Sequence, residues 1–187
     1  MSERSKHPWR ERLNRRSFLR GAGAGVLAVS PVGAAYARSL ETRALSFVHT
    51  HTGENLSSVY FEAGKYVPSS LERINVLLRD FRTQDVYPID PRVLDILFDL
   101  RSLVGADAPY HVISGYRSPR TNAALRSRSS GVAEHSFHLQ GRAIDVRLEG
   151  FSTRRLHDFA LQMRRGGVGF YAQSDFVHLD SGPVRFW

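Results

Sequence analysis

Two histidines and an aspartate in this sequence have the types and spacing of a metal site. His138 and Asp145 lie seven residues apart in the segment HSFHLQGRAIDV, residues 135–146, and His178 follows in the later segment FVHLD. Two imidazoles and a carboxylate are a ligand set of catalytic zinc sites, in which the fourth position stays open. Zinc lowers the pKa of bound water from 15.7 to about 7, so that water becomes a nucleophile toward an amide at neutral pH.

The absence of cysteine narrows the choice of ligands. The 187-residue chain contains no cysteine, so any metal must be held by His, Asp or Glu side chains, and no disulfide can form. Nitrogen and oxygen donors in a tetrahedral arrangement suit zinc, although cobalt or manganese can occupy the same donors.

Strand periodicity predicts how these ligands meet. Residues 143–148, AIDVRL, alternate as a strand, with Asp145 on the face opposite the apolar side chains. Residues 176–180, FVHLD, place His178 opposite their apolar side chains in the same way. If the two strands are neighbours, Asp145 and His178 share one open face, and a glycine turn swings His138 over it.

The remaining patterns predict a mixed scaffold. A β-hairpin is expected over residues 43–62, with His49 and His51 near its turn as solvent-facing residues rather than ligands. One helix is expected to have Ser69 or Ser70 as its N-cap, and the next is expected to have Asp90 as its N-cap and to end at Gly105.

Further elements complete the predicted fold class. We expect helices over residues 121–128 and 152–165, and strands over residues 111–115, 168–171 and 184–187. Strands near the front, helices next and several strands later favour an α+β fold with a largely antiparallel sheet flanked by helices.

The first 37 residues have the pattern of a twin-arginine export signal. The segment NRRSFLR at residues 14–20 precedes a Gly/Ala/Val run at residues 21–29 and a small-residue cleavage site, AYA, at residues 35–37. The run is too short and glycine-rich to span ~30 Å of hydrocarbon well. We therefore expect a periplasmic protein, tethered to the membrane only if the signal is uncleaved, and a single domain over residues 38–187.

Net charge gives little reason to expect a nucleic-acid partner. The whole chain has a formal charge of +8, but seven of its 26 basic and two of its 18 acidic residues lie in the first 37. The remaining 19 basic and 16 acidic residues leave a charge of +3. We expect no nucleic-acid binding from such a balance.

Three motifs together resemble a known family. Residues 136–145, SFHLQGRAID, resemble the S-x-H-x-x-G-x-A-x-D motif of the D-Ala-D-Ala metallopeptidases, which share a zinc-peptidase fold with lysostaphin and the hedgehog signalling domain. Residues 175–180, DFVHLD, resemble the family's second motif, and residues 114–118, SGYRS, resemble its arginine motif. The three motifs occur in the same order as in that family and span about half of the expected domain.

The resemblance implies roles for individual residues. His138, Asp145 and His178 would hold one zinc ion. Asp175 would be the general base, and Arg117 would polarise the scissile carbonyl and stabilise the oxyanion. Three further residues are candidates for substrate binding or for supporting the ligands: Ser136, His135 and Asp180.

The implied function is hydrolysis of amide bonds in the cell wall. With the export signal and the small size, the chain is most similar to the murein endopeptidases of this group, which cleave cross-links between peptidoglycan stem peptides. A D,D-carboxypeptidase, a D-Ala-D-Ala dipeptidase and a different exported hydrolase stay open. A non-catalytic zinc-stabilised module that binds the wall also stays open, although the presence of Asp175 and Arg117 favours catalysis.

Overall fold

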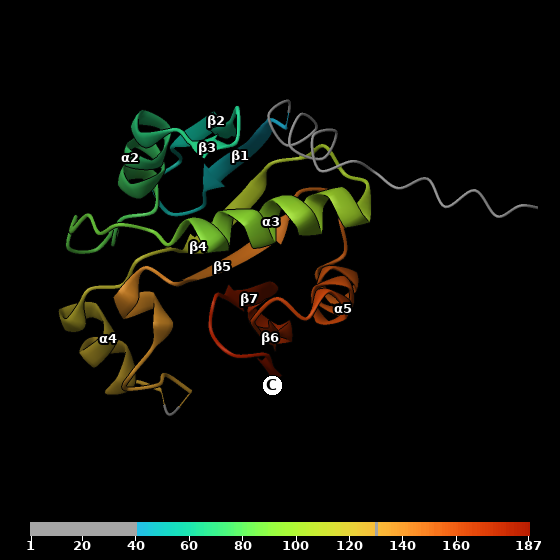
Figure 1. Ribbon diagram of the computed structural model, residues 1–187. Helices are drawn as coiled ribbons and strands as arrows, with labels where there is room; N and C mark the ends of the chain where they lie inside the picture. The colour runs from blue at the N-terminus through green and yellow to red at the C-terminus, as the bar shows by residue number, and fades with distance from the viewer. Residues whose placement is uncertain (1–40, 130) are drawn as a thin grey trace, which may run out of the picture.

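An eight-stranded sheet organises residues 41–129 and 131–187, the part of the chain that this computed structural model describes (Figure 1). The strand order is β3-β2-β1-β4-β5-β7-β6-β8. The strands are β1 (Arg43–His49), β2 (Asn55–Glu62), β3 (Lys65–Tyr66), β4 (Tyr110–Ser114), β5 (Ala143–Leu148), β6 (Gly167–Tyr171), β7 (Phe176–Asp180) and β8 (Arg185–Phe186). Only β1 with β4 and β6 with β8 pair in parallel among these strands, which confirms the α+β class and the largely antiparallel sheet.

Helices α2, α3 and α5 pack against strands of the sheet. Helices α3 (Pro91–Val104) and α5 (Thr153–Met163) pack on each other and on the strands, and α3 crosses in front of the sheet in Figure 1. Helix α2 (Pro68–Leu77) packs against β2. Helix α4 (Pro119–Arg126) follows β4, and the 3₁₀ helix η1 (Phe137–Gln140) precedes β5.

The hydrophobic core explains why the ligands face away from α3 and α5. Ile144 and Val146 of β5 and Val177 and Leu179 of β7 are buried in one core with apolar residues of both helices. Because side chains alternate along a strand, Asp145 and His178 project from the other face. The antiparallel register pairs Asp145 directly with His178, so the predicted neighbourhood of these two strands is confirmed.

The predicted N-cap is confirmed for α3 but not for α2. Asp90 caps α3 as predicted, since its side chain accepts a hydrogen bond from the backbone N–H of Arg92, and Gly105 ends the helix in the left-handed conformation. The prediction that Ser69 or Ser70 caps α2 is wrong. That helix begins at Pro68 without a side-chain cap, because proline already has the helical φ at the first position.

His49 is not the solvent-facing residue that the hairpin pattern predicted. Only 1% of its surface is exposed. The ring of Phe81 packs edge-on against it at 5.5 Å, so a loop distant in sequence covers this end of β1.

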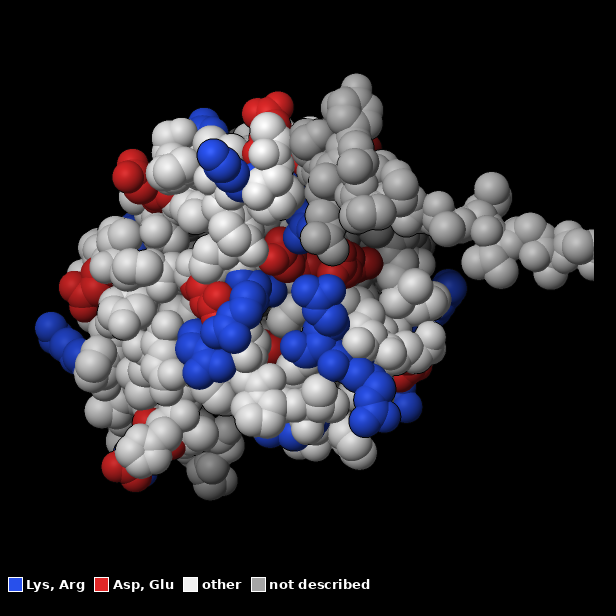
Figure 2. All heavy atoms as spheres, viewed as in Figure 1, with Lys and Arg blue, Asp and Glu red and all other residues white. Residues whose placement is uncertain are grey.

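Charges of both signs are interspersed on the face that carries α3 and α5 (Figure 2). Arg92 pairs with Asp90 at 2.7 Å, and Arg165 pairs with Asp99. Within residues 41–129 and 131–187, we find no helix that is long and apolar enough to cross a membrane. The predicted export signal, residues 1–37, lies outside the described residues.

Candidate metal centre

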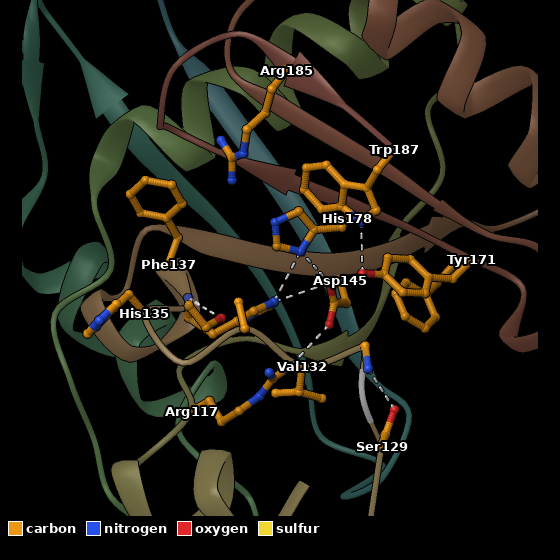
Figure 3. Close-up of a pocket in the computed structure, with 15 residues that line it drawn as sticks. Arg117, Ser129, Val132, His135, Phe137, Asp145, Tyr171, His178, Arg185 and Trp187 are labelled. Carbon is orange, nitrogen blue, oxygen red and sulfur yellow. Dashed lines mark hydrogen bonds and ion pairs between the residues drawn. The ribbon is translucent and has the colours of Figure 1, made fainter. Parts of the chain in front are cut away.

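Three potential ligands converge on the face of the sheet opposite α3 and α5 (Figure 3). The Nδ1 atom of His178 lies 2.8 Å from Oδ1 of Asp145 and 3.2 Å from Nε2 of His138. The third side of this triangle, from His138 Nε2 to Asp145 Oδ1, is 3.2 Å. These distances place the three donor atoms in one compact cluster. All three residues are buried, and the cluster lies beneath a cavity.

Hydrogen bonds fix which nitrogen of each imidazole faces the cluster. His138 donates from Nδ1 to the backbone carbonyl of Gly115 at 2.7 Å, which leaves the Nε2 lone pair free for a ligand. His178 donates from Nε2 to Oδ2 of Asp180 at 3.0 Å, which leaves Nδ1 free. Partners of this kind orient metal-binding histidines and raise their basicity.

Electrostatics keeps the cluster charged in the absence of metal. Burial lowers the pKa of His178, but its hydrogen bonds to Asp145 and Asp180 outweigh this effect and raise that pKa to about 9. Burial also opposes ionisation of Asp145, yet the adjacent imidazoles of His138 and His178 hold its carboxyl pKa well below the usual range. A proton therefore balances the buried carboxylate, and a divalent cation can take its place.

The donor set fits zinc. Ligand bonds of 2.0–2.1 Å in a tetrahedral array place donor atoms about 3.3 Å apart, close to the observed separations. Two neutral nitrogens and one carboxylate oxygen have the borderline character that zinc prefers, and the cavity leaves room for a further ligand. Among the described residues this is the one His/Asp/Glu group with such geometry.

A tight turn brings His138 over the sheet. Ser136 accepts a hydrogen bond from the His138 backbone N–H and so caps η1, and Gly141 ends this short helix with φ of +63°. A Cβ atom on Gly141 would lie 2.1 Å from the carbonyl oxygen of Pro88, so no larger residue fits without displacing that loop.

A cavity of about 550 Å³ opens above the three ligands. One wall is aromatic: Tyr171 and Phe176 stack at 4.5 Å, and Trp187 donates from its indole N–H to the Tyr171 hydroxyl at 3.0 Å. The opposite wall is formed by Ser129 and by the loop at residues 131–136, which includes His135 and Ser136. Sequence reasoning did not identify Phe176 or Trp187 as part of the cleft.

Arg117 lines the same cavity with donors to spare. Its NH2 lies 3.6 Å from Oδ2 of Asp145, and its NH1 lies 3.4 Å from Oδ1 of Asn122. Its Nε is buried and has no hydrogen-bond partner in the described part of the chain. Because Arg117 lines the cavity and its two side-chain contacts use few of its five N–H donors, this guanidinium can receive an oxygen atom of a ligand.

Asp175 lies where the motif requires but points elsewhere. It occupies a left-handed position, φ of +50°, between the 3₁₀ helix η2 (Ala172–Ser174) and β7. Its carboxylate is 61% exposed and pairs with NH1 of Arg147 at 3.1 Å. It does not line the cavity, so the structure brings Arg117 and the three ligands together but leaves Asp175 bound to Arg147.

Two buried aspartates, Asp180 and Asp80, form hydrogen bonds with residues at or next to the site. Asp180 is almost fully buried and contacts Arg185 at 2.6 Å in addition to His178. Asp80, which sequence reasoning missed because it lies in a loop with no recognisable motif, accepts the backbone N–H of Ser118 at 2.8 Å. This bond fixes the residue that follows Arg117.

The charge on Asp80 is expected to make stability depend on pH. Burial opposes ionisation, but hydrogen bonds from Thr121 and Ser118 outweigh it and lower the pKa of Asp80 to about 2. A folded-state pKa below the unfolded value of about 3.9 means that this stabilisation, roughly 2 kcal/mol, is complete above pH ~4 and lost as pH falls toward 2. Urea unfolding of the wild type and of Asp80→Asn should therefore differ by about that amount at neutral pH and converge near pH 2.

Other acids titrate in both proteins and cancel in this difference. A constant difference between pH 5 and pH 2 would contradict the assignment to Asp80.

An α+β sheet that presents two histidines, an aspartate and a spare arginine to one cleft has the arrangement of a single-metal hydrolase. A family model described as "Peptidoglycan L,D-endopeptidase MepK" matches residues 37–187, and the chain belongs to this peptidase family. The Escherichia coli (strain K12) protein named "Peptidoglycan L,D-endopeptidase MepK" is 40% identical over 176 residues, which are 93% of this chain and 97% of that protein. A Haemophilus influenzae protein named "Probable peptidoglycan L,D-endopeptidase MepK" is 40% identical over 146 residues, 78% of each chain. The chain is thus a peptidase, as the motif resemblance implied.

Proposed function

We propose that this protein is a zinc-dependent murein endopeptidase that hydrolyses amide bonds in the cross-links between peptidoglycan stem peptides. The observation that carries the proposal is the cluster of His138 Nε2, His178 Nδ1 and an Asp145 oxygen beneath a cavity that also exposes Arg117. The names of the relatives specify an L,D bond, so cross-links containing an L,D bond are the proposed substrate.

Different residues of the chain would have different roles in hydrolysis. His138, Asp145 and His178 would hold the zinc ion, which when bound activates water at neutral pH and polarises a carbonyl. Arg117 would bind the scissile carbonyl oxygen through its unused donors and stabilise the negative charge that develops there. Asp175 would accept a proton from the attacking water and deliver it to the leaving amine, which requires its carboxylate to leave Arg147.

We also propose that the protein works in the periplasm after export by the twin-arginine route. The arginine pair at residues 15–16 and the small-residue site at residues 35–37 support this proposal. The alignment with the Escherichia coli relative spans 176 residues, more than the 150 residues of the expected domain, so it extends into this leader.

Digestion of purified sacculi tests the activity directly. Zinc-loaded protein is expected to convert cross-linked muropeptides into uncross-linked ones, and protein stripped with a chelator is expected to be inactive until zinc is restored. Mass spectrometry of the products, with sacculi rich in either L,D or D,D cross-links, identifies the bond. Unchanged muropeptides from both kinds of sacculi under zinc-replete conditions would exclude the proposed activity. Release of single D-alanine or of the D-Ala-D-Ala dipeptide would instead favour the carboxypeptidase or dipeptidase alternatives.

A further inference from the structure

One buried amide contacts both Arg117 and the loop that forms the opposite wall of the cavity. Asn122 lies in α4 and is only 4% exposed. Its Oδ1 accepts a hydrogen bond from NH1 of Arg117 at 3.4 Å. Its Nδ2 donates to the backbone carbonyl of Ala133 at 3.2 Å and approaches that of Glu134 at 3.5 Å.

Helix formation does not explain this asparagine. Ser118 already caps α4, since its hydroxyl accepts the backbone N–H of Thr121. The backbone N–H of Asn122 is satisfied by the carbonyl of Ser118 at 2.9 Å. Asparagine is a weak helix former, so its place inside an eight-residue helix calls for a reason in the side chain.

Among the described residues, the amide is one of two side-chain groups that contact the Arg117 guanidinium. The other is Asp145, at 3.6 Å, and the buried Nε has no partner among the described residues. A guanidinium with so few contacts can rotate, and loss of one contact changes where its donors point. The same amide holds residues 133 and 134, next to His135 and Ser136 in the cavity wall.

We infer that Asn122 is a positioning residue that couples the cavity wall at residues 131–136 to the orientation of Arg117. Substrate that contacts this loop then also stabilises the guanidinium in the direction of the scissile carbonyl. The inference rests on the proposed function for its kinetic consequence, but the coupling between loop and arginine is a property of the protein alone.

The kinetic test is a double-mutant cycle with a purified cross-linked muropeptide as substrate. We expect Asn122→Ala to lower kcat roughly 10- to 100-fold, because small displacements of a positioned catalytic group have effects of that size. In an Arg117→Met background the same substitution should change kcat less than twofold, because there is no guanidinium left to orient. Zinc content should stay at one ion per chain in every variant.

Arg126→Gln is the matched control. It removes the exposed ion pair of Arg126 with Glu134, 3.1 Å, which also joins α4 to this loop but does not contact Arg117. We expect less than a twofold change in kcat for this variant.

A second measurement does not depend on activity. Hydrogen exchange of the backbone amides at residues 131–136 should be at least about tenfold faster in Asn122→Ala, and faster in Arg117→Met than in the wild type. Asn122→Asp is the second variant in case the alanine variant does not fold. It keeps the size of the side chain but has an oxygen in place of the NH₂ group. It should therefore show the same increase in hydrogen exchange at residues 131–136.

The outcomes distinguish failure of the coupling through Asn122 from failure of the proposed peptidase function. Equal effects of Asn122→Ala on kcat with and without Arg117, or unchanged exchange of residues 131–136 in both Asn122 variants, would overturn the coupling. If the wild type cleaves no muropeptide, the proposed function fails, and the exchange measurements still decide the coupling.

Discussion

Replacing His138 with alanine is expected to abolish stoichiometric zinc binding and to lower peptidase activity by at least ~10⁴-fold, because the nucleophile and the polarised carbonyl both depend on the metal. His138 is one of three protein ligands in the proposed site, and its Nε2 lies within 3.2 Å of both other donors. Two remaining donors hold zinc far more weakly than three, and the buried Asp145 carboxylate loses one of the imidazoles beside it.

Metal analysis and calorimetric zinc titration check this prediction without relying on activity. His135→Ala is the matched control, since it removes an imidazole three residues earlier that lines the same cavity but is not in the ligand cluster. His135→Ala should retain one zinc per chain. A His138→Ala protein that is folded by circular dichroism and still binds zinc with wild-type affinity would refute the ligand assignment.

The substitution also has a structural cost that must be separated from metal loss. In the wild type the His138 ring donates to the carbonyl of Gly115, which is left without this partner in the variant. The expected destabilisation is about 1–3 kcal/mol. His138→Gln retains a donor in this region and serves as the second variant if alanine unfolds the domain.

Replacing Asp175 with asparagine is expected to lower kcat by roughly 10²- to 10⁴-fold while zinc content stays at wild-type level, the range typical of a lost general base. The reason for testing this residue is its position before β7, three residues from His178, where the resemblance to the D-Ala-D-Ala metallopeptidases implies a base. Its carboxylate pairs with Arg147, so a role as the base would require a rotation that breaks this ion pair. An exposed pair of this kind costs little to break, about 0–1 kcal/mol.

The split between kcat and KM distinguishes a base from a residue that only maintains the loop. If Asp175 acts only in the chemical step, Asp175→Asn should lower kcat and leave KM within about twofold of the wild-type value. Asp158→Asn, which changes another exposed aspartate that pairs with an arginine, is the control and should retain wild-type kcat. Near-wild-type activity in Asp175→Asn would place the base elsewhere in the cleft.

Family membership and the geometry of the site both indicate a peptidase. The relatives establish a peptidase family, and the structure shows which atoms of this chain can meet a metal and a substrate carbonyl. Asp175 is the residue for which the role implied by the motif and the position of the side chain differ most.

The sequence alone determined which face each ligand occupies. Alternation along residues 143–148 and 176–180 placed Asp145 and His178 opposite the apolar side chains, because strand geometry leaves only two directions for a side chain. The glycine at position 141 indicated the turn that carries His138, since few other residues adopt its positive φ.

Only the tertiary structure decided which groups those ligands meet. Three contacts join segments more than ten residues apart: the pairing of β5 with β7, the ion pair of Asp175 with Arg147, and the hydrogen bond of Asn122 with Ala133. Burial of His49 beneath Phe81 is of the same kind. Local periodicity records the direction of a side chain but not its partner, because packing between distant segments selects the register and the neighbours.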